Sequence, residues 1–243
     1  MKLRREIDKH MFPDWEAINI VNGIPWPRID SAAIATLTMG GNIVDVPLKE
    51  EYSFQAMDYL DTPAALPLYE AQADIIMKNG YKKIVDVGAR HGPVNDILYE
   101  RGYIDDDYEY MGFDTSHQPI EYANLVWEEF DNIEYRTTTW ENLNEIATTF
   151  AADCVIWSGV LLYRPMDHME LFERLQKFYN SNNAIIQEPC KDQPTELWLK
   201  NVRLNTIDDQ LHMYRERYAE YTDEVLTLDV FAGKRVVAHV RMK

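Results

Sequence analysis

The chain has 243 residues, 46% of them hydrophobic, so it can bury a full core and is not disordered by composition. Asp and Glu number 41 against 24 Lys and Arg, and the net charge of −17 argues against a broad grip on a nucleic-acid backbone. Two cysteines, Cys154 and Cys190, cannot form a disulfide scaffold and indicate a reducing, cytoplasmic environment. Apolar runs fall far short of the ~20 residues of a membrane helix, and the N-terminus lacks an apolar signal segment, so we expect no membrane association.

The first 65 residues differ from the rest of the chain in proline content and in hydrophobic periodicity. Five prolines punctuate them, and long periodic stretches are few. Two apolar runs, residues 31–38 and 43–48, flank the pair Gly40-Gly41, which is typical of a β-hairpin. We therefore predict an N-terminal extension over residues 1–65 that forms a lid, a homodimer contact or both.

From residue 66 onward, helical and extended segments alternate. Residues 66–79 carry apolar side chains at helical spacing and are followed by the extended run 82–88. Further helices are expected over 93–102, 118–130, 140–150 and 166–178, and further strands over 108–113, 133–138, 153–157 and 184–187. Such alternation is typical of a parallel sheet covered by helices on both faces.

Two β-rich runs close the sequence. Residues 225–231 and 235–241 are separated only by Ala232-Gly233-Lys234, a short link that favours an antiparallel hairpin. For residues 66–243 we predict an α/β domain: a doubly wound, mostly parallel seven-stranded sheet that ends in an antiparallel C-terminal hairpin.

The first strand–turn–helix unit runs from Ile84 to Pro93 and contains two glycines. Gly88 permits a sharp turn at the end of the strand, and Gly92 lets the backbone approach a ligand closely. The amides at the start of the following helix favour an anionic group. The alternative is that both glycines serve only the packing of helix on sheet.

A second candidate, Asp114, ends the next predicted strand. A carboxylate at this position can accept hydrogen bonds from both hydroxyls of a ribose. It follows Asp86 by 28 residues, more than the ~20 of the dinucleotide fingerprint. A plain helix N-cap is the alternative role for Asp114.

Residues 66–189 resemble the class I S-adenosylmethionine-dependent methyltransferase family. The matching motifs are Ile84-Val85-Asp86-Val87-Gly88 for the first strand, Phe113-Asp114-Thr115-Ser116 for the ribose-binding end of the second, and 153–163 for the fourth strand and its turn. Residues 183–189 resemble the fifth strand, and the C-terminal hairpin agrees with the family's reversed last strand.

This resemblance implies that S-adenosylmethionine is the cofactor. The cofactor-binding positions it implies are Asp86, Gly88, Ala89, Arg90, Gly92, Asp114, Thr115, Thr139, Trp140, Ser158 and Gly159. Two positions depart from the family pattern. Arg90 stands where the family usually has glycine, and could reach the cofactor carboxylate or partly fill the pocket. Thr139 replaces an acidic residue near the adenine.

No catalytic residue is identified by the sequence. His168, Tyr163 and Glu188 are the candidates for an acceptor site, because they follow the fourth and fifth strands. Their alternatives are a solvated helix face for His168, an aromatic lid for Tyr163 and a strand end for Glu188. We expect no metal, since Cys and His lack zinc spacing.

The resemblance implies an enzyme that transfers a methyl group from S-adenosylmethionine to a small molecule or a protein side chain. The acidic composition argues against nucleic acid as a partner. Two alternatives stay open. The departures at Arg90 and Thr139 suit a non-catalytic methyltransferase-like module, whereas a nicotinamide-dependent oxidoreductase would require a Gly-x-Gly-x-x-Gly turn and a parallel sixth strand.

Overall fold

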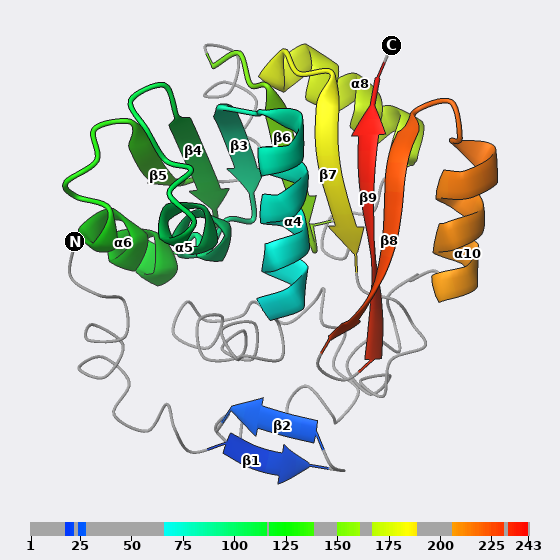
Figure 1. Ribbon diagram of the computed structural model, residues 1–243, viewed down its shortest axis with the longest axis horizontal. Helices are drawn as coiled ribbons and strands as arrows, with labels where there is room; N and C mark the ends of the chain where they lie inside the picture. Colours follow the sequence, from blue (N-terminus) through cyan, green and yellow to red (C-terminus); the bar gives the residue numbers. More distant parts are fainter. Residues whose placement is uncertain are drawn as a thin grey trace.

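A seven-stranded sheet forms the centre of the computed structural model, which describes residues 18–21, 24–27, 66–115, 117–138, 150–160, 167–188, 206–230 and 233–242. The strand order is β5-β4-β3-β6-β7-β9-β8 (Figure 1). The strands are β3 (Lys83–Val87), β4 (Glu109–Asp114), β5 (Ile133–Thr137), β6 (Cys154–Ser158), β7 (Asn183–Glu188), β8 (Thr222–Val230) and β9 (Gly233–Arg241).

Strands β3 to β7 run parallel, and β9 pairs antiparallel with both β7 and β8. The chain proceeds outward from β3 through β4 to β5, and then returns to the other side of β3 to add β6 and β7. This reversal creates a switch point between β3 and β6, where the carboxyl ends of open α/β sheets leave a crevice. The predicted mostly parallel sheet with a C-terminal antiparallel hairpin is confirmed.

Helices cover both faces of the sheet. Figure 1 shows α4 (Leu66–Asn79), α5 (Pro93–Glu100) and α6 (His117–Val126) in front of it and α8 (His168–Tyr179) behind it. Because side chains alternate along a strand, Ile84 joins the buried cluster under the three front helices, while Val85 and Val87 join the cluster under α8. The core therefore consists of two layers separated by the sheet.

Most predicted elements lie within a few residues of the observed ones, but some differ. α6 ends at Val126 rather than near residue 130. A short helix, α10 (Ile207–His212), continues into a π-helical turn (Met213–Arg217) that the periodicity did not indicate. In the described residues, no helix is long and apolar enough to cross a membrane.

Two of the predicted elements are not tested by the described residues. The hairpin expected around Gly40 and the helix expected over 140–150 lie outside them, apart from Phe150. A different hairpin is present, formed by β1 (Ile18–Val21) and β2 (Ile24–Pro27). The boundary at residue 65 stays a prediction.

The turn between β3 and α5 depends on Gly92. This residue precedes the first helical residue, Pro93, and has a left-handed φ of 78°. A Cβ at this position would lie 1.8 Å from the hydroxyl oxygen of Tyr135 and 2.7 Å from its Cζ. Glycine is therefore required here both by the backbone conformation and by the tyrosine packed beneath it.

Replacing Gly92 with alanine is predicted to destabilise the protein by about 3 kcal/mol, from the positive φ and the steric overlap together. Gly102 is a matched control, because its φ of 67° is similar but a Cβ there meets nothing within 4 Å. Gly102→Ala should cost only about 1 kcal/mol. Urea denaturation measures both free energies of unfolding, and equal losses would contradict this account.

Candidate functional site

The candidate site lies at the carboxyl edge of the sheet, where the turn after β3 is bound to the end of β4. The amides of Gly88 and Ala89 both donate to the carbonyl oxygen of Phe113, at 2.8 and 2.9 Å. Gly88 has a left-handed φ of 81°. These bonds hold the turn over residues 88–92 against the second strand, as a ligand site shared by two strand ends requires.

Asp114 is fixed at this edge by its neighbours. Its Oδ2 accepts a hydrogen bond from the amide of Arg90 at 3.1 Å, and its carbonyl oxygen accepts one from the amide of Thr138 at 2.9 Å. The side chain is partly buried, and the following Thr115 is exposed. A carboxylate is thus held beside the glycine turn.

Arg90 has a backbone conformation that glycine adopts far more readily than other residues. Its φ is 49°, in the left-handed region, and its side chain is only 8% exposed. Such a conformation costs a non-glycine residue about 1–2 kcal/mol. The turn therefore carries a non-glycine residue in a strained conformation and a buried cationic side chain.

Asp86 lies within β3, two residues before Gly88. Its side chain is 4% exposed, and its Oδ2 accepts a hydrogen bond from the hydroxyl of Tyr110 at 2.8 Å. Burial raises the pKa of Asp86 to about 7, with a smaller contribution from the charge of Asp114, although the Tyr110 hydrogen bond opposes the shift. Contact of Asp86 with a cofactor stays a prediction.

The turn after β6 completes the edge. Ser158 Oγ donates to Gln187 Oε1 at 2.9 Å and accepts from Gln72 Nε2 at 3.3 Å, and the amide of Gly159 donates to the Gln187 carbonyl oxygen at 2.7 Å. A Cβ on Gly88 would lie 3.1 Å from Val160 Cγ2, so the turns after β3 and β6 adjoin.

The two buried glutamines in this cluster are not among the site residues predicted from the sequence. Gln72 and Gln187 are 1% and 3% exposed, and they come from α4 and β7. Their only sequence signal is a polar residue within a segment that is otherwise apolar. Since buried amides require hydrogen-bond partners, that signal could have suggested a role at the strand ends.

His168 is packed among aromatic side chains rather than placed on a solvated helix face. Its Nε2 lies 2.9 Å from the hydroxyl oxygen of Tyr214, and its ring stacks on Tyr218 with centroids 5.6 Å apart. Burial lowers the pKa of His168 to about 4, so the ring is neutral near pH 7.

Glu188 borders the same aromatic group from the end of β7. It is 8% exposed, and its charge adds to burial in raising the pKa of Tyr214 well above the usual value. The structure thus places two of the three catalytic candidates, His168 and Glu188, next to Tyr214.

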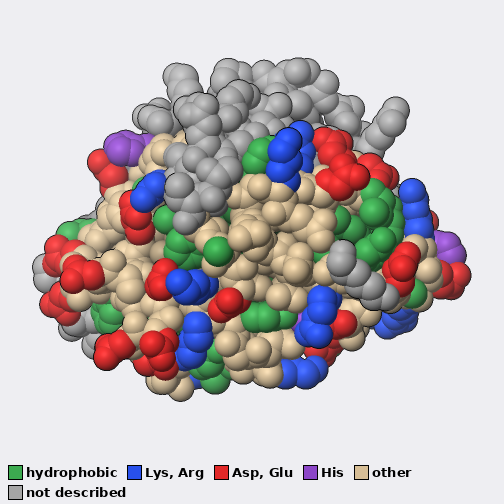
Figure 2. Space-filling model, turned by 90° about the horizontal axis from the view of Figure 1, so that it is seen from above, with side chains coloured by type: hydrophobic (Ala, Val, Ile, Leu, Met, Phe, Trp, Pro, Cys, Tyr) green, Lys and Arg blue, Asp and Glu red, His purple; other side chains and the backbone are tan. Residues whose placement is uncertain are grey.

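Other predicted positions give no catalytic group within the described part of the chain. Thr139, Trp140 and Tyr163 lie outside it. Cys154 is fully buried, and burial raises its pKa, which disfavours the thiolate. Among the described residues, no group of three or more His, Cys, Asp or Glu could hold a metal ion. On the face seen in Figure 2, acidic side chains are interspersed with basic ones.

No family model and no curated protein matches the sequence. The structure is similar to the CurJ carbon methyltransferase, with a TM-score of 0.60 and 13% identity over 98% of this chain and 70% of that one. The plantazolicin methyltransferase BpumL, crystallised with S-adenosylhomocysteine and a pentazolic desmethylPZN analog, has a TM-score of 0.56 and 15% identity, covering 87% and 95% of the two chains.

The N-methyltransferase NodS from Bradyrhizobium japonicum WM9, in complex with S-adenosylhomocysteine, has a TM-score of 0.54 and 11% identity over 87% of this chain and 96% of its own. This chain has the class I methyltransferase fold. The strands labelled β3 and β4 here correspond to the first and second strands of that fold. Gly88 and Asp114 therefore lie at the two strand ends to which the sequence motifs were assigned.

The buried carboxyl of Asp86 makes a specific prediction about pH. In the folded protein it keeps its proton up to about pH 7, whereas the ordinary value is 3.8. The folded state therefore binds more protons than the unfolded state in this window, and its stability falls as pH rises from about 4 to 7. Asp86→Asn removes this loss.

Urea denaturation of the wild type and Asp86→Asn across this pH window measures the effect. The stability of the variant relative to the wild type should increase as pH rises. A difference between the two proteins that is constant with pH would show that Asp86 titrates normally.

Proposed function

We propose that the protein is an S-adenosylmethionine-dependent methyltransferase that acts on a small molecule or a protein side chain. One observation carries the proposal: the Asp114 carboxylate is held beside a left-handed glycine turn by the Arg90 amide, at the carboxyl edge of a class I methyltransferase sheet. Fold alone does not define function, and it is this pair of strand ends that favours a nucleoside ligand.

The residues present suit the nucleoside of S-adenosylmethionine. Asp114 would accept hydrogen bonds from the ribose hydroxyls, with Thr115 next to it. The turn over residues 88–92, including Ala89 and Arg90, would lie against the amino-acid end of the cofactor, because a left-handed turn without bulky side chains at its glycines allows close approach. Thr139 and Trp140 are proposed to flank the adenine.

The catalytic demand on the protein is modest. The cofactor supplies a reactive sulfonium methyl group, so alignment of the acceptor with that group provides much of the rate. Ser158 and Gly159 border the adjoining turn and would position the reacting groups. A base is needed only when the acceptor loses a proton, and the packed, neutral His168 favours a structural role for that residue.

The acceptor is proposed from charge and composition. A net charge of −17 disfavours nucleic acid and leaves small molecules and protein side chains. With two cysteines in the chain, we place the protein in the cytoplasm. Residues 1–65 are proposed to cover the acceptor or to form a homodimer contact.

One of the two alternatives fits the structure less well, and the other is separated from an enzyme only by experiment. A nicotinamide-dependent oxidoreductase would be expected to end in a parallel sixth strand, and β9 is antiparallel to β7. A non-catalytic module is favoured by one observation, the buried side chain of Arg90 within the cofactor turn. Labelled methyl transfer across a broad acceptor panel separates an enzyme from such a module, which would bind cofactor without forming product.

Asp114→Ala is predicted to weaken cofactor binding about tenfold or more, because a charge-assisted hydrogen bond contributes about 1.5–3 kcal/mol. Calorimetric titration with S-adenosylhomocysteine measures the dissociation constant. Asp106→Ala is the control, since it removes an equal charge from an exposed loop position and should leave binding unchanged. Equal affinity in all three proteins would remove Asp114 from the site, and absence of binding by the wild type would refute the proposed function.

A further inference from the structure

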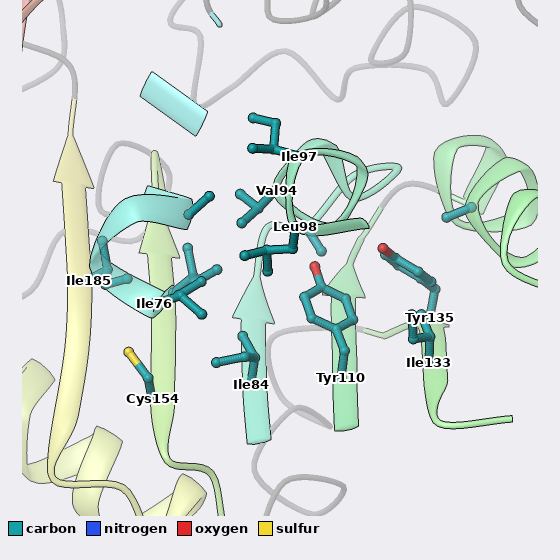
Figure 3. Close-up of a cluster of buried hydrophobic side chains, with 14 of the residues drawn as sticks. Ile76, Ile84, Val94, Ile97, Leu98, Tyr110, Ile133, Tyr135, Cys154 and Ile185 are labelled. Atoms are coloured by element: carbon teal, nitrogen blue, oxygen red, sulfur yellow. The ribbon is translucent and has the colours of Figure 1, made fainter. Parts of the chain in front are cut away.

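Tyr135 extends from β5 beneath the glycine turn. Figure 3 shows its ring leaving β5 with the hydroxyl directed toward the helix that carries Val94 and Leu98. The side chain is 3% exposed, and its ring lies 5.2 Å from that of Tyr110, centroid to centroid. The phenol ring of Tyr135 therefore reaches from β5 to the start of α5.

Two glycines from separate elements make room for this ring. At Gly112 in β4, a Cβ would lie 2.6 Å from Tyr135 Cδ1, so the ring lies directly over the second strand. At Gly92, a Cβ would lie 1.8 Å from the hydroxyl oxygen. The same side chain thus sets the distance between β4 and the end of the turn.

A hydrogen bond fixes the position of the hydroxyl. Asn95 Nδ2 donates to Tyr135 Oη at 2.9 Å, and Asn95 Oδ1 accepts from the hydroxyl of Tyr108 at 2.6 Å. Asn95 is fully buried in the first turn of α5, three residues after Gly92. Because both ends of the amide are engaged, one side chain joins the start of the helix to β5 and to Tyr108, the residue directly before β4.

We propose that Tyr135 is a positioning residue for cofactor binding. Its hydroxyl sets how far the turn over residues 88–92 stands from β4, and thereby aligns that turn with the amino-acid end of S-adenosylmethionine. The proposal rests on the function proposed above. The first part of the turn is held by hydrogen bonds from the amides of Ala89 and Arg90 to β4. Tyr135 supports its last residue, Gly92.

This role differs from general support of the core. A displacement of Gly92 is transmitted to the turn, since the Gly92 amide donates to the Ala89 carbonyl oxygen at 2.9 Å. Asp114 is itself part of β4, and its carbonyl oxygen is held by the amide of Thr138, so its place is set by the sheet although its carboxylate also accepts from the Arg90 amide. Loss of the Tyr135 hydroxyl should therefore affect ligands that reach the turn and spare ligands that reach only Asp114.

Tyr135→Phe tests the proposal, with Tyr108→Phe as the matched control. Each variant deletes one hydroxyl that bonds to Asn95, but the Tyr135 hydroxyl is the one that lies nearest to the Cβ position of Gly92. Calorimetry is carried out with two ligands: S-adenosylhomocysteine, and methylthioadenosine, which has the same nucleoside but lacks the amino-acid end. Thermal unfolding records the stability of each variant.

We expect Tyr135→Phe to weaken S-adenosylhomocysteine binding about five- to tenfold, the worth of one hydrogen bond, and to leave methylthioadenosine binding unchanged. Tyr108→Phe should bind both ligands as the wild type does, even when its melting temperature falls as far. Parallel losses for both ligands, or equal behaviour of the two variants, would overturn the proposal.

Asn95→Leu provides a second route if Tyr135→Phe does not fold. It removes the same bond from the helix side and should reproduce the selective loss for S-adenosylhomocysteine, whereas unselective or absent loss would count against the proposal. A wild type that binds neither ligand would refute the proposed function itself, which separates that failure from failure of the Tyr135 role.

Discussion

The arrangement of the site depends on the bonds between the ends of two neighbouring parallel strands. The amides of Gly88 and Ala89 share the Phe113 carbonyl oxygen, and the next amide, of Arg90, donates to the Asp114 carboxylate. Since these groups lie in the turn directly after β3 and at the end of β4, the in-register pairing of the two strands brings the turn and Asp114 together. Asp114 is thereby oriented toward the turn, as recognition of a nucleoside across two strand ends requires.

The polar groups beneath this junction are unusual for a protein core. Asp86, Asn95 and three tyrosines lie on the same face of the sheet as the front helices. Hydrogen bonds pair Asp86 with Tyr110 and Asn95 with both Tyr108 and Tyr135. A satisfied buried network gives a single arrangement, whereas an apolar filling would tolerate several. The first turn of α5 is consequently joined to the sheet by side-chain hydrogen bonds as well as by apolar packing.

Much of the fold could be predicted from sequence because its signals are local. β-branched runs such as residues 82–88, bounded by glycine and proline, identify parallel strands, and the short link at Gly233 identifies the final hairpin. Gly88 and Asp114 were found because they end strands. Tyr135 and Gln72 were not found, since their importance arises from contacts with residues distant in sequence. His168 was assigned a solvated face because acidic neighbours flank it, yet its ring packs on the π-helical turn, which periodicity does not reveal.

A crystal structure of the protein with S-adenosylhomocysteine tests the central claim most directly. The account predicts both ribose hydroxyls within hydrogen-bonding distance of the Asp114 carboxylate, and the amino-acid end of the ligand against the turn over residues 88–92. A ligand bound away from this edge, or a crevice filled by the protein's own side chains, would contradict the account and leave only the class I methyltransferase fold.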